Sequence, residues 1–164
     1  MKKLSLTFLI CFMIHSLFAQ VFYYKAEWSM KDKHDLFTGI CKIEIKDNEM
    51  VKGELVWKFL AVDSTDNSMM DMYKGKKGKS GIEFVEGNYN PSTHDIFFEG
   101  QEKDDPCEIL GLDKYSLKRS ADGLVLYGTT ATGGTNKGLF YAHKLKAVEG
   151  VMEFKTAKLK VSKK

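Results

Sequence analysis

The sequence contains only two prolines and three cysteines among its 164 residues. So few cysteines exclude a disulfide-dense mini-protein, and the 14 glycines follow no collagen-like period. A content of 43% hydrophobic and 12% aromatic residues excludes an intrinsically disordered chain. The length favours one globular domain over two.

The sequence also lacks the short motifs of common catalytic and nucleotide-binding sites. It contains no GxSxG elbow, P-loop or Rossmann fingerprint. His34, His94 and His143 do not have the spacing of metal ligands. The acids between residues 104 and 113 lack the EF-hand spacing, which favours a solvated loop over a calcium site. We therefore predict no catalytic residue, no metal and no cofactor.

The first 19 residues have the pattern of a signal peptide. Lys2 and Lys3 precede the apolar run Leu4–Leu17, and Ala19 provides a small residue before a cleavage site at Gln20. We therefore expect export to the periplasm or the extracellular medium.

Two alternatives to a cleaved signal peptide are an uncleaved membrane anchor and a lipoprotein attached at Cys11. The apolar run is short for a membrane span of about 20 residues. Bulky Ile10 stands before Cys11, where a lipid-attachment motif normally has a small residue. Both alternatives are therefore disfavoured, and no transmembrane span is expected in the mature chain.

The charge of the mature chain is unevenly distributed. Residues 155–164 contain five lysines and no acid, whereas residues 20–154 contain 18 basic and 22 acidic side chains. This Lys-rich tail could contact phosphate or anionic lipid, but a solvated, frayed terminus is the preferred interpretation. The absence of an Arg-rich stripe or RNA-binding aromatic motif excludes a nucleic-acid partner.

From Val21 onward, apolar residues recur at every second position, which is the pattern of half-buried strands. The clearest case is a hairpin on either side of Asp47-Asn48, where Leu55 and Trp57 alternate with charged residues. Further turn signals divide the chain into about eight antiparallel strands. Phe154–Val161 is interpreted as a last edge strand or a free end.

An apolar-x-Gly theme recurs in four of the expected strands, at Gly53, Gly87, Gly100 and Gly128. Glycine inside a strand often marks a sharp bend of the sheet. One such bend per strand is what a small closed barrel requires. We therefore predict an all-β, antiparallel up-and-down barrel over residues 20–154, with a two-sheet sandwich as the alternative.

Four motifs follow one another between Trp28 and Leu145: G-x-x-x-I-x-I, V-x-G-x-L-x-W, E-F-V-E-G-x-Y and L-x-G-x-T. Their order resembles small up-and-down barrels of the avidin and lipocalin (calycin-like) type. The lipocalin Gly-x-Trp of the first strand is absent, and no biotin-contacting residue of avidin can be placed. The resemblance implies a barrel that binds a ligand in its mouth, but it specifies no ligand.

Cys41 and Cys107 remain after cleavage of the signal peptide. In an oxidising compartment, two cysteines favour one disulfide, and the alternative is two separate buried thiols. A bridge over so long a loop would stabilise the fold by about 4 kcal/mol in the chain-entropy model.

The predicted binding site consists of residues expected to face the barrel interior: Trp57, Leu55, Tyr89, Phe98, Tyr141 and His143. Trp57 lies next to the loop Ala61–Ser80, in which Met69, Met70 and Met72 would form an adaptable apolar lid.

Three functions are compatible with this interpretation. The first is an exported barrel that binds a small apolar or amphipathic molecule. The alternative is an envelope or extracellular interaction protein, with a packed core, that binds protein or glycan through its loops. The third is a small barrel enzyme that uses His94 or His143 with a nearby acid.

The signal peptide generates the first testable prediction. The mature chain is expected to begin at Gln20 or within a few residues of it, and intact-mass measurement of protein from the periplasm or medium checks this. A mass that retains Met1, or a diacylated Cys11, would contradict it.

Overall fold

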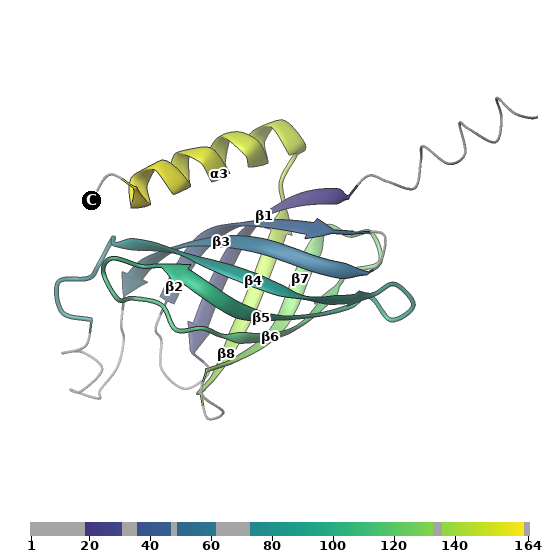
Figure 1. Cartoon of the computed structure of the whole chain (residues 1–164), viewed down its shortest axis with the longest axis horizontal. Helices are drawn as coiled ribbons and strands as arrows, with labels where there is room; N and C mark the ends of the chain where they lie inside the picture. The colour runs from purple at the N-terminus through teal and green to yellow at the C-terminus, as the bar shows by residue number, and fades with distance from the viewer. Residues whose placement is uncertain (1–18, 31–35, 47–48, 62–72, 133–135, 163–164) are drawn as a thin grey trace, which may run out of the picture.

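The alternating residues form a closed antiparallel barrel in the computed structural model, with one helix on its outside (Figure 1). The structure describes residues 19–30, 36–46, 49–61, 73–132 and 136–162. The strands are β1 (Gln20–Met30), β2 (Leu36–Ile45), β3 (Met50–Ala61), β4 (Ser80–Asn90), β5 (Asp95–Asp104), β6 (Lys114–Arg119), β7 (Val125–Thr132) and β8 (Asn136–Lys144).

The strands follow one another around the ring in sequence order, and β8 pairs with β1 to close it. The predicted up-and-down barrel is therefore confirmed, and the two-sheet sandwich is wrong. The signal peptide, apart from Ala19, and the three methionines of the expected lid lie outside the described residues. No helix in the described ranges is long and apolar enough to cross a membrane.

The register of the hairpin β2–β3 sets which side chains point inward. Trp57 pairs with Gly39 and Leu55 pairs with Cys41, and both Trp57 and Leu55 are buried in the interior. A Cβ atom on Gly39 would lie 2.7 Å from the Trp57 ring, so glycine leaves the space that the indole fills. The register between β4 and β5 shifts between Phe84 and Val85, which marks a β-bulge.

The inward face of β8 is the opposite of the one predicted. Phe140 and Ala142 are buried, whereas Tyr141 and His143 are exposed on the outer surface. Both alternating faces of this strand carry apolar residues, so the period of two does not distinguish them. The pairing of Ala142 with Ala26 decides the face, because Ala26 points into the core.

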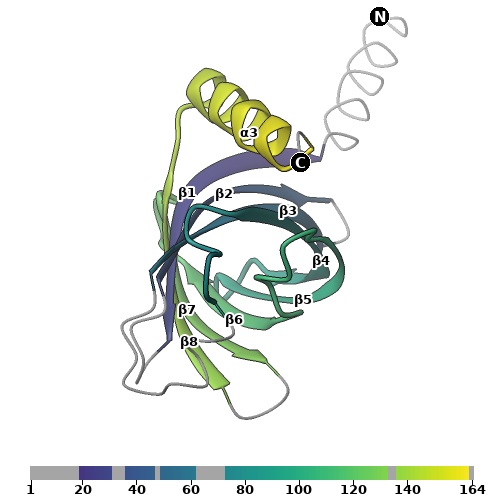
Figure 2. The same ribbon diagram turned by 90° about the vertical axis from the view of Figure 1, so that its left-hand side faces the viewer.

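The Lys-rich end of the chain is not an edge strand or a free end. Residues 147–161 form helix α3 (Ala147–Val161), which lies on the outside of the barrel (Figures 1 and 2). Phe154 and Val161, two helical turns apart, pack with outward-facing Ile40, Val56 and Ile82 in a second, smaller core. The prediction of a strand was wrong because helical spacing within a lysine-rich segment was not recognised.

Polar contacts also attach α3 to the sheet. Lys158 on the helix pairs with Glu54 on β3, and Glu54 also accepts a hydrogen bond from Lys42 on β2 at 3.3 Å. A groove of about 550 Å³ lies beside this network, between the end of the helix and the strands. Opposite charges thus pair with one another along the groove.

The packing of α3 gives a second prediction. Phe154→Ala is expected to lower the free energy of unfolding by about 3 kcal/mol, because it removes the main apolar contact between helix and barrel. Met152 is 66% exposed on the same helix, so Met152→Ala should stay within about 0.5 kcal/mol of wild type. Urea denaturation followed by circular dichroism measures both. Equal effects of the two substitutions would contradict the docking of α3.

Candidate functional site

The two ends of the barrel differ in the length of their connections. The β1–β2, β3–β4, β5–β6 and β7–β8 connections meet at one end, which we call the long-loop end, and the three other connections form the short-turn end. Figure 2 looks onto the long-loop end. The described segments at residues 73–79 and 105–113 lie across the barrel opening there.

Four aromatic side chains form a connected cluster at the long-loop end, which we call the mouth cluster. Trp28 and Phe37 have ring centroids 5.4 Å apart, and Phe37 lies 5.2 Å from Phe59. Tyr73 stacks on Phe59 at 4.6 Å. Trp28 and Tyr73 are only partly buried, and the Trp28 indole N–H donates a 2.6 Å hydrogen bond to Thr130. An aromatic surface is therefore available close to the opening.

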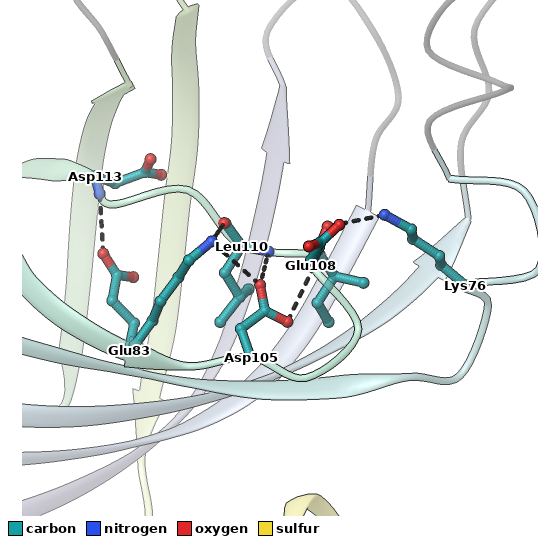
Figure 3. A network of polar contacts seen from close by, with 8 residues as sticks. Lys76, Glu83, Asp105, Glu108, Leu110 and Asp113 are labelled. Atoms are coloured by element: carbon teal, nitrogen blue, oxygen red, sulfur yellow. Dashed lines mark hydrogen bonds and ion pairs between the residues drawn. The ribbon is translucent and has the colours of Figure 1, made fainter. Parts of the chain in front are cut away.

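A carboxyl group lies in the interior at the same end of the barrel. Glu83 pairs with Leu55 in the β3–β4 ladder and is 2% exposed. Its Oε1 accepts a 2.9 Å hydrogen bond from the Asp113 backbone N–H, shown in Figure 3, and its Oε2 accepts a 2.5 Å bond from the Tyr115 hydroxyl. A Cβ on Gly100 would lie 2.3 Å from Oε1. Glycine at this position therefore makes room for the acid.

Burial controls the protonation of this group. Desolvation raises the pKa of Glu83 to about 7, although the hydrogen bonds from Tyr115 and the Asp113 backbone lower it in part. Desolvation likewise raises the pKa of the Tyr115 hydroxyl, which the nearby Glu83 charge raises further. Glu83 therefore exchanges a proton near neutral pH, while Tyr115 stays a neutral hydrogen-bond donor.

The segment Asp105–Leu112, which we call the cap loop, lies over this carboxyl. The Asp105 carboxylate accepts hydrogen bonds from the backbone N–H groups of Ile109 at 3.0 Å and Leu110 at 2.7 Å (Figure 3). Lys76 donates a 3.0 Å bond to the Glu108 carbonyl. Ile109 is buried in the main core, so the cap loop closes the barrel with an apolar side chain as well as polar bonds.

The acids of the cap loop do not form a cation site. Asp105 uses both oxygens within the loop, and the described residues contain no group of three or more His, Cys, Asp or Glu side chains placed to hold a metal.

The structure brings together three of the six residues predicted to line the site. Leu55, Trp57 and Phe98 are all in the main core, and the Trp57 and Phe140 rings meet edge to face at 6.0 Å. Tyr89 lies at the short-turn end, where its hydroxyl is 3.1 Å from His94 Nδ1.

The other two predicted residues do not reach the interior. Tyr141 and His143 are exposed on the outer face of β8, and their rings contact each other at 4.7 Å.

The predicted disulfide between Cys41 and Cys107 is not formed. Cys41 is completely buried on the inner face of β2, Cys107 lies in the cap loop, and the structure does not join the two sulfur atoms. Burial raises the pKa of the Cys41 thiol well above its ordinary value, so that this group remains protonated. The prediction failed because two cysteines in one sequence do not establish that their sulfur atoms meet.

Sequence reasoning did not find Glu83, Tyr115 and Asp113 as a group. A signal was present for Glu83, because it alternates with Gly81, Val85 and Gly87 on the inward positions of β4. The consecutive apolar residues Phe84 and Val85 obscured that alternation in the sequence. The partners Tyr115 and Asp113 are distant in sequence and meet Glu83 only through the barrel closure.

The fold and site thus define a closed eight-stranded barrel with an aromatic mouth above a buried acid. No protein-family model matches the chain, and neither a curated protein nor a solved structure matches it. The resemblance to avidin and lipocalin barrels therefore rests on shape and short motifs.

The buried acid gives a third prediction. Because the folded pKa of Glu83, about 7, exceeds the ordinary 4.5, folded protein retains a proton that unfolded chain releases. The Glu83 contribution to stability is therefore complete below about pH 4.5 and decreases by about 3 kcal/mol as pH rises to about 7. Glu83→Gln should abolish this pH-dependent loss.

Urea denaturation from pH 4 to pH 8 measures the effect as the difference between wild type and variant. Glu99→Gln, on the outer face of β5, is the matched control and should follow wild type. Parallel pH profiles for wild type and Glu83→Gln would contradict a buried, proton-carrying acid.

Proposed function

We propose that the protein is an exported binding module that takes a small apolar or amphipathic molecule at the long-loop end of its barrel. The observation that carries this proposal is the mouth cluster, in which partly exposed aromatic rings lead from the opening toward the packed interior. Ligand sites in proteins combine such apolar walls with a few placed polar groups.

Glu83 and Tyr115 would supply the polar part of the site. An apolar portion of the ligand would lie against Phe37, Phe59 and Tyr73, and a hydroxyl or amide would reach the Glu83–Tyr115 pair. A neutral Glu83 donates one hydrogen bond, whereas its ionised form only accepts. The preferred polar group of the ligand would therefore change from acceptor to donor as pH rises through 7.

The cap loop provides the means of entry. Lys76 and Lys103 hold it through bonds to the backbone carbonyls of Glu108 and Leu110, and these bonds lie at exposed positions. Exposed polar contacts contribute little to stability, so the cost of opening the cap loop comes mainly from exposing buried Ile109. Displacement of Ile109 and Leu110 would uncover the apolar interior below.

Export from the cell also belongs to the proposal, and it rests on the signal-peptide pattern of residues 1–19. A binding module outside the cytoplasm would meet small molecules from the surroundings.

A second function is favoured by a different observation. Tyr127 and Tyr141 are cross-strand partners on the outer face of β7 and β8, and both are exposed together with Leu139. The central core is at the same time densely filled, with Trp57, Tyr115 and Phe140 in edge-to-face contact. This combination suits an envelope or extracellular interaction protein that binds protein or glycan by its surface and loops.

A neutral fluorescent probe, N-phenyl-1-naphthylamine, tests the proposed site. We expect saturable binding to wild type with one probe per chain. Tyr73→Ser should weaken binding by about tenfold, because a stacked ring is lost from the mouth cluster. Tyr127→Ser, a matched change on the outer face, should bind as wild type does.

The alternatives give different results in this titration. Absence of saturable binding by correctly folded wild-type protein would overturn the binding proposal and favour the interaction protein. Loss of binding in Tyr127→Ser but not in Tyr73→Ser would place the probe on the outer face.

A further inference from the structure

The short-turn end contains an arginine with unusual surroundings. Arg119 is the only arginine of the chain, in which all other basic residues apart from histidine are lysines. It ends β6, and its guanidinium lies 4.6 Å from the centroid of the Phe22 ring. Its Nε atom is buried and has no hydrogen-bond partner among the described residues. Unpaired buried donors are uncommon in folded proteins, and on a charged group they are costly.

A second cation shares the same aromatic ring. The Lys144 Nζ, at the end of β8, is 4.7 Å from the centroid of Phe22. Phe22 belongs to the start of β1, so the closure of the barrel brings these two positive charges to one ring. An anion that binds beside this ring would be attracted by both charges.

The neighbouring groups of Arg119 are neutral hydrogen-bonding groups. Burial disfavours its charge, but interactions with the Tyr24 and Tyr89 hydroxyls outweigh this and raise its pKa, so it stays protonated. Burial raises the pKa of Tyr24 itself, and the Tyr24 hydroxyl donates to the Gly123 carbonyl at 3.2 Å. The Tyr89 hydroxyl lies 3.1 Å from His94 Nδ1.

No carboxylate forms an ion pair with Arg119 or Lys144 within the described part of the chain. Asp122, in the adjacent β6–β7 turn, accepts bonds at Oδ1 from the Ser120 hydroxyl at 2.5 Å and the Leu124 N–H at 3.0 Å. The lowered pKa of Asp122 comes mainly from these two bonds and least from the Arg119 charge, and Asp122 and Arg119 form no ion pair. Elsewhere on the barrel, lysines such as Lys52 and Lys42 pair with glutamates of the neighbouring strand.

From this arrangement we infer that the short-turn end is an oxyanion-binding site, in which Arg119 and Lys144 bind a phosphate or carboxylate group. The guanidinium presents its donors in a planar fork that matches two oxygens of such a group, and Lys144 adds a point charge. The Tyr89 oxygen accepts a hydrogen bond from the guanidinium and so helps to orient it. Gly123 has a φ of +69°, and a Cβ atom at this position would lie 2.3 Å from the Arg119 guanidinium. The turn therefore needs glycine here to leave space for the guanidinium.

This site is distinct from the one proposed at the long-loop end. Its residues belong to the start of β1, the end of β6 and the end of β8, whereas the mouth cluster and Glu83 lie at the opposite end of the strands. The proposal of an oxyanion site is therefore independent of the ligand site proposed at the mouth cluster.

Side-chain NMR of the full mature chain tests the proposal. Inorganic phosphate should shift the single Arg Nε–Hε resonance saturably, beyond the effect of sodium chloride at equal ionic strength. Lys144→Gln should weaken phosphate binding by about tenfold. Lys114→Gln, on the outer face of β6, removes the same charge from an exposed position and should bind as wild type does. Arg119→Lys retains the charge without the fork and should also weaken binding.

Two further arms identify the source of the oxyanion. Acetate replaces phosphate as the carboxylate probe, and vesicles of phosphatidylcholine with phosphatidylglycerol replace it as the lipid phosphate. The melting temperature of each variant shows whether it is folded. If Arg119→Lys does not fold, the comparison of Lys144→Gln with Lys114→Gln is sufficient to test the proposal. Absence of a saturable Arg resonance shift with all three probes would overturn the proposal. So would equal phosphate affinity in wild type, Lys144→Gln and Lys114→Gln, because a purely structural pair of cations predicts that result.

Discussion

The whole molecule depends on the fit of side chains inside a barrel of eight strands. Such a barrel is just wide enough for its own side chains, so each large inward group needs a small one opposite. Trp57 occupies the space above Gly39, and Glu83 occupies the space beside Gly100. These two pairs place an indole and a carboxyl group in the same interior layer. The positions of Gly39 and Gly100 therefore determine where the indole and the carboxyl group can lie at the long-loop end.

The same constraint gives the two ends of the barrel different chemistry. At the long-loop end, a buried acid with a pKa of about 7 lies below aromatic rings, and the two longest connections, β3–β4 and β5–β6, belong to this end. At the short-turn end, tight turns leave no room for a long cap, and two cations lie on Phe22 instead. Helix α3 lies on the side wall of the barrel, where it covers outward-facing residues of β1 to β4. The helix thus completes the packing without closing either opening.

Sequence patterns predicted the fold well wherever one face of a strand was charged. In β3, Lys52 and Lys58 define the outer face, so the burial of Leu55 and Trp57 could be predicted. In β8, both faces carry apolar residues, so the sequence does not show which set of side chains faces the interior. Only the pairing with β1 determines that Phe140 points inward. The alternation in β4 indicates an inward position for Glu83, but Tyr115, which offsets the cost of burying it, is 32 positions away and could not be predicted as its partner. Helix α3 was missed because its lysines dominate a segment with few buried positions.

The pairing of the first strand with the last has a consequence for how the chain reaches this structure. Trp28 on β1 bonds to Thr130 on β7, 102 positions later, and Ala26 pairs with Ala142 on β8. Contacts of such long range require a large loss of chain entropy before they stabilise anything, so topologies of this kind fold slowly. Until β8 is in place, both β1 and β7 have an unpaired edge that is open to other chains. The pairing of β8 thus sets the time for which the folding chain is exposed to aggregation.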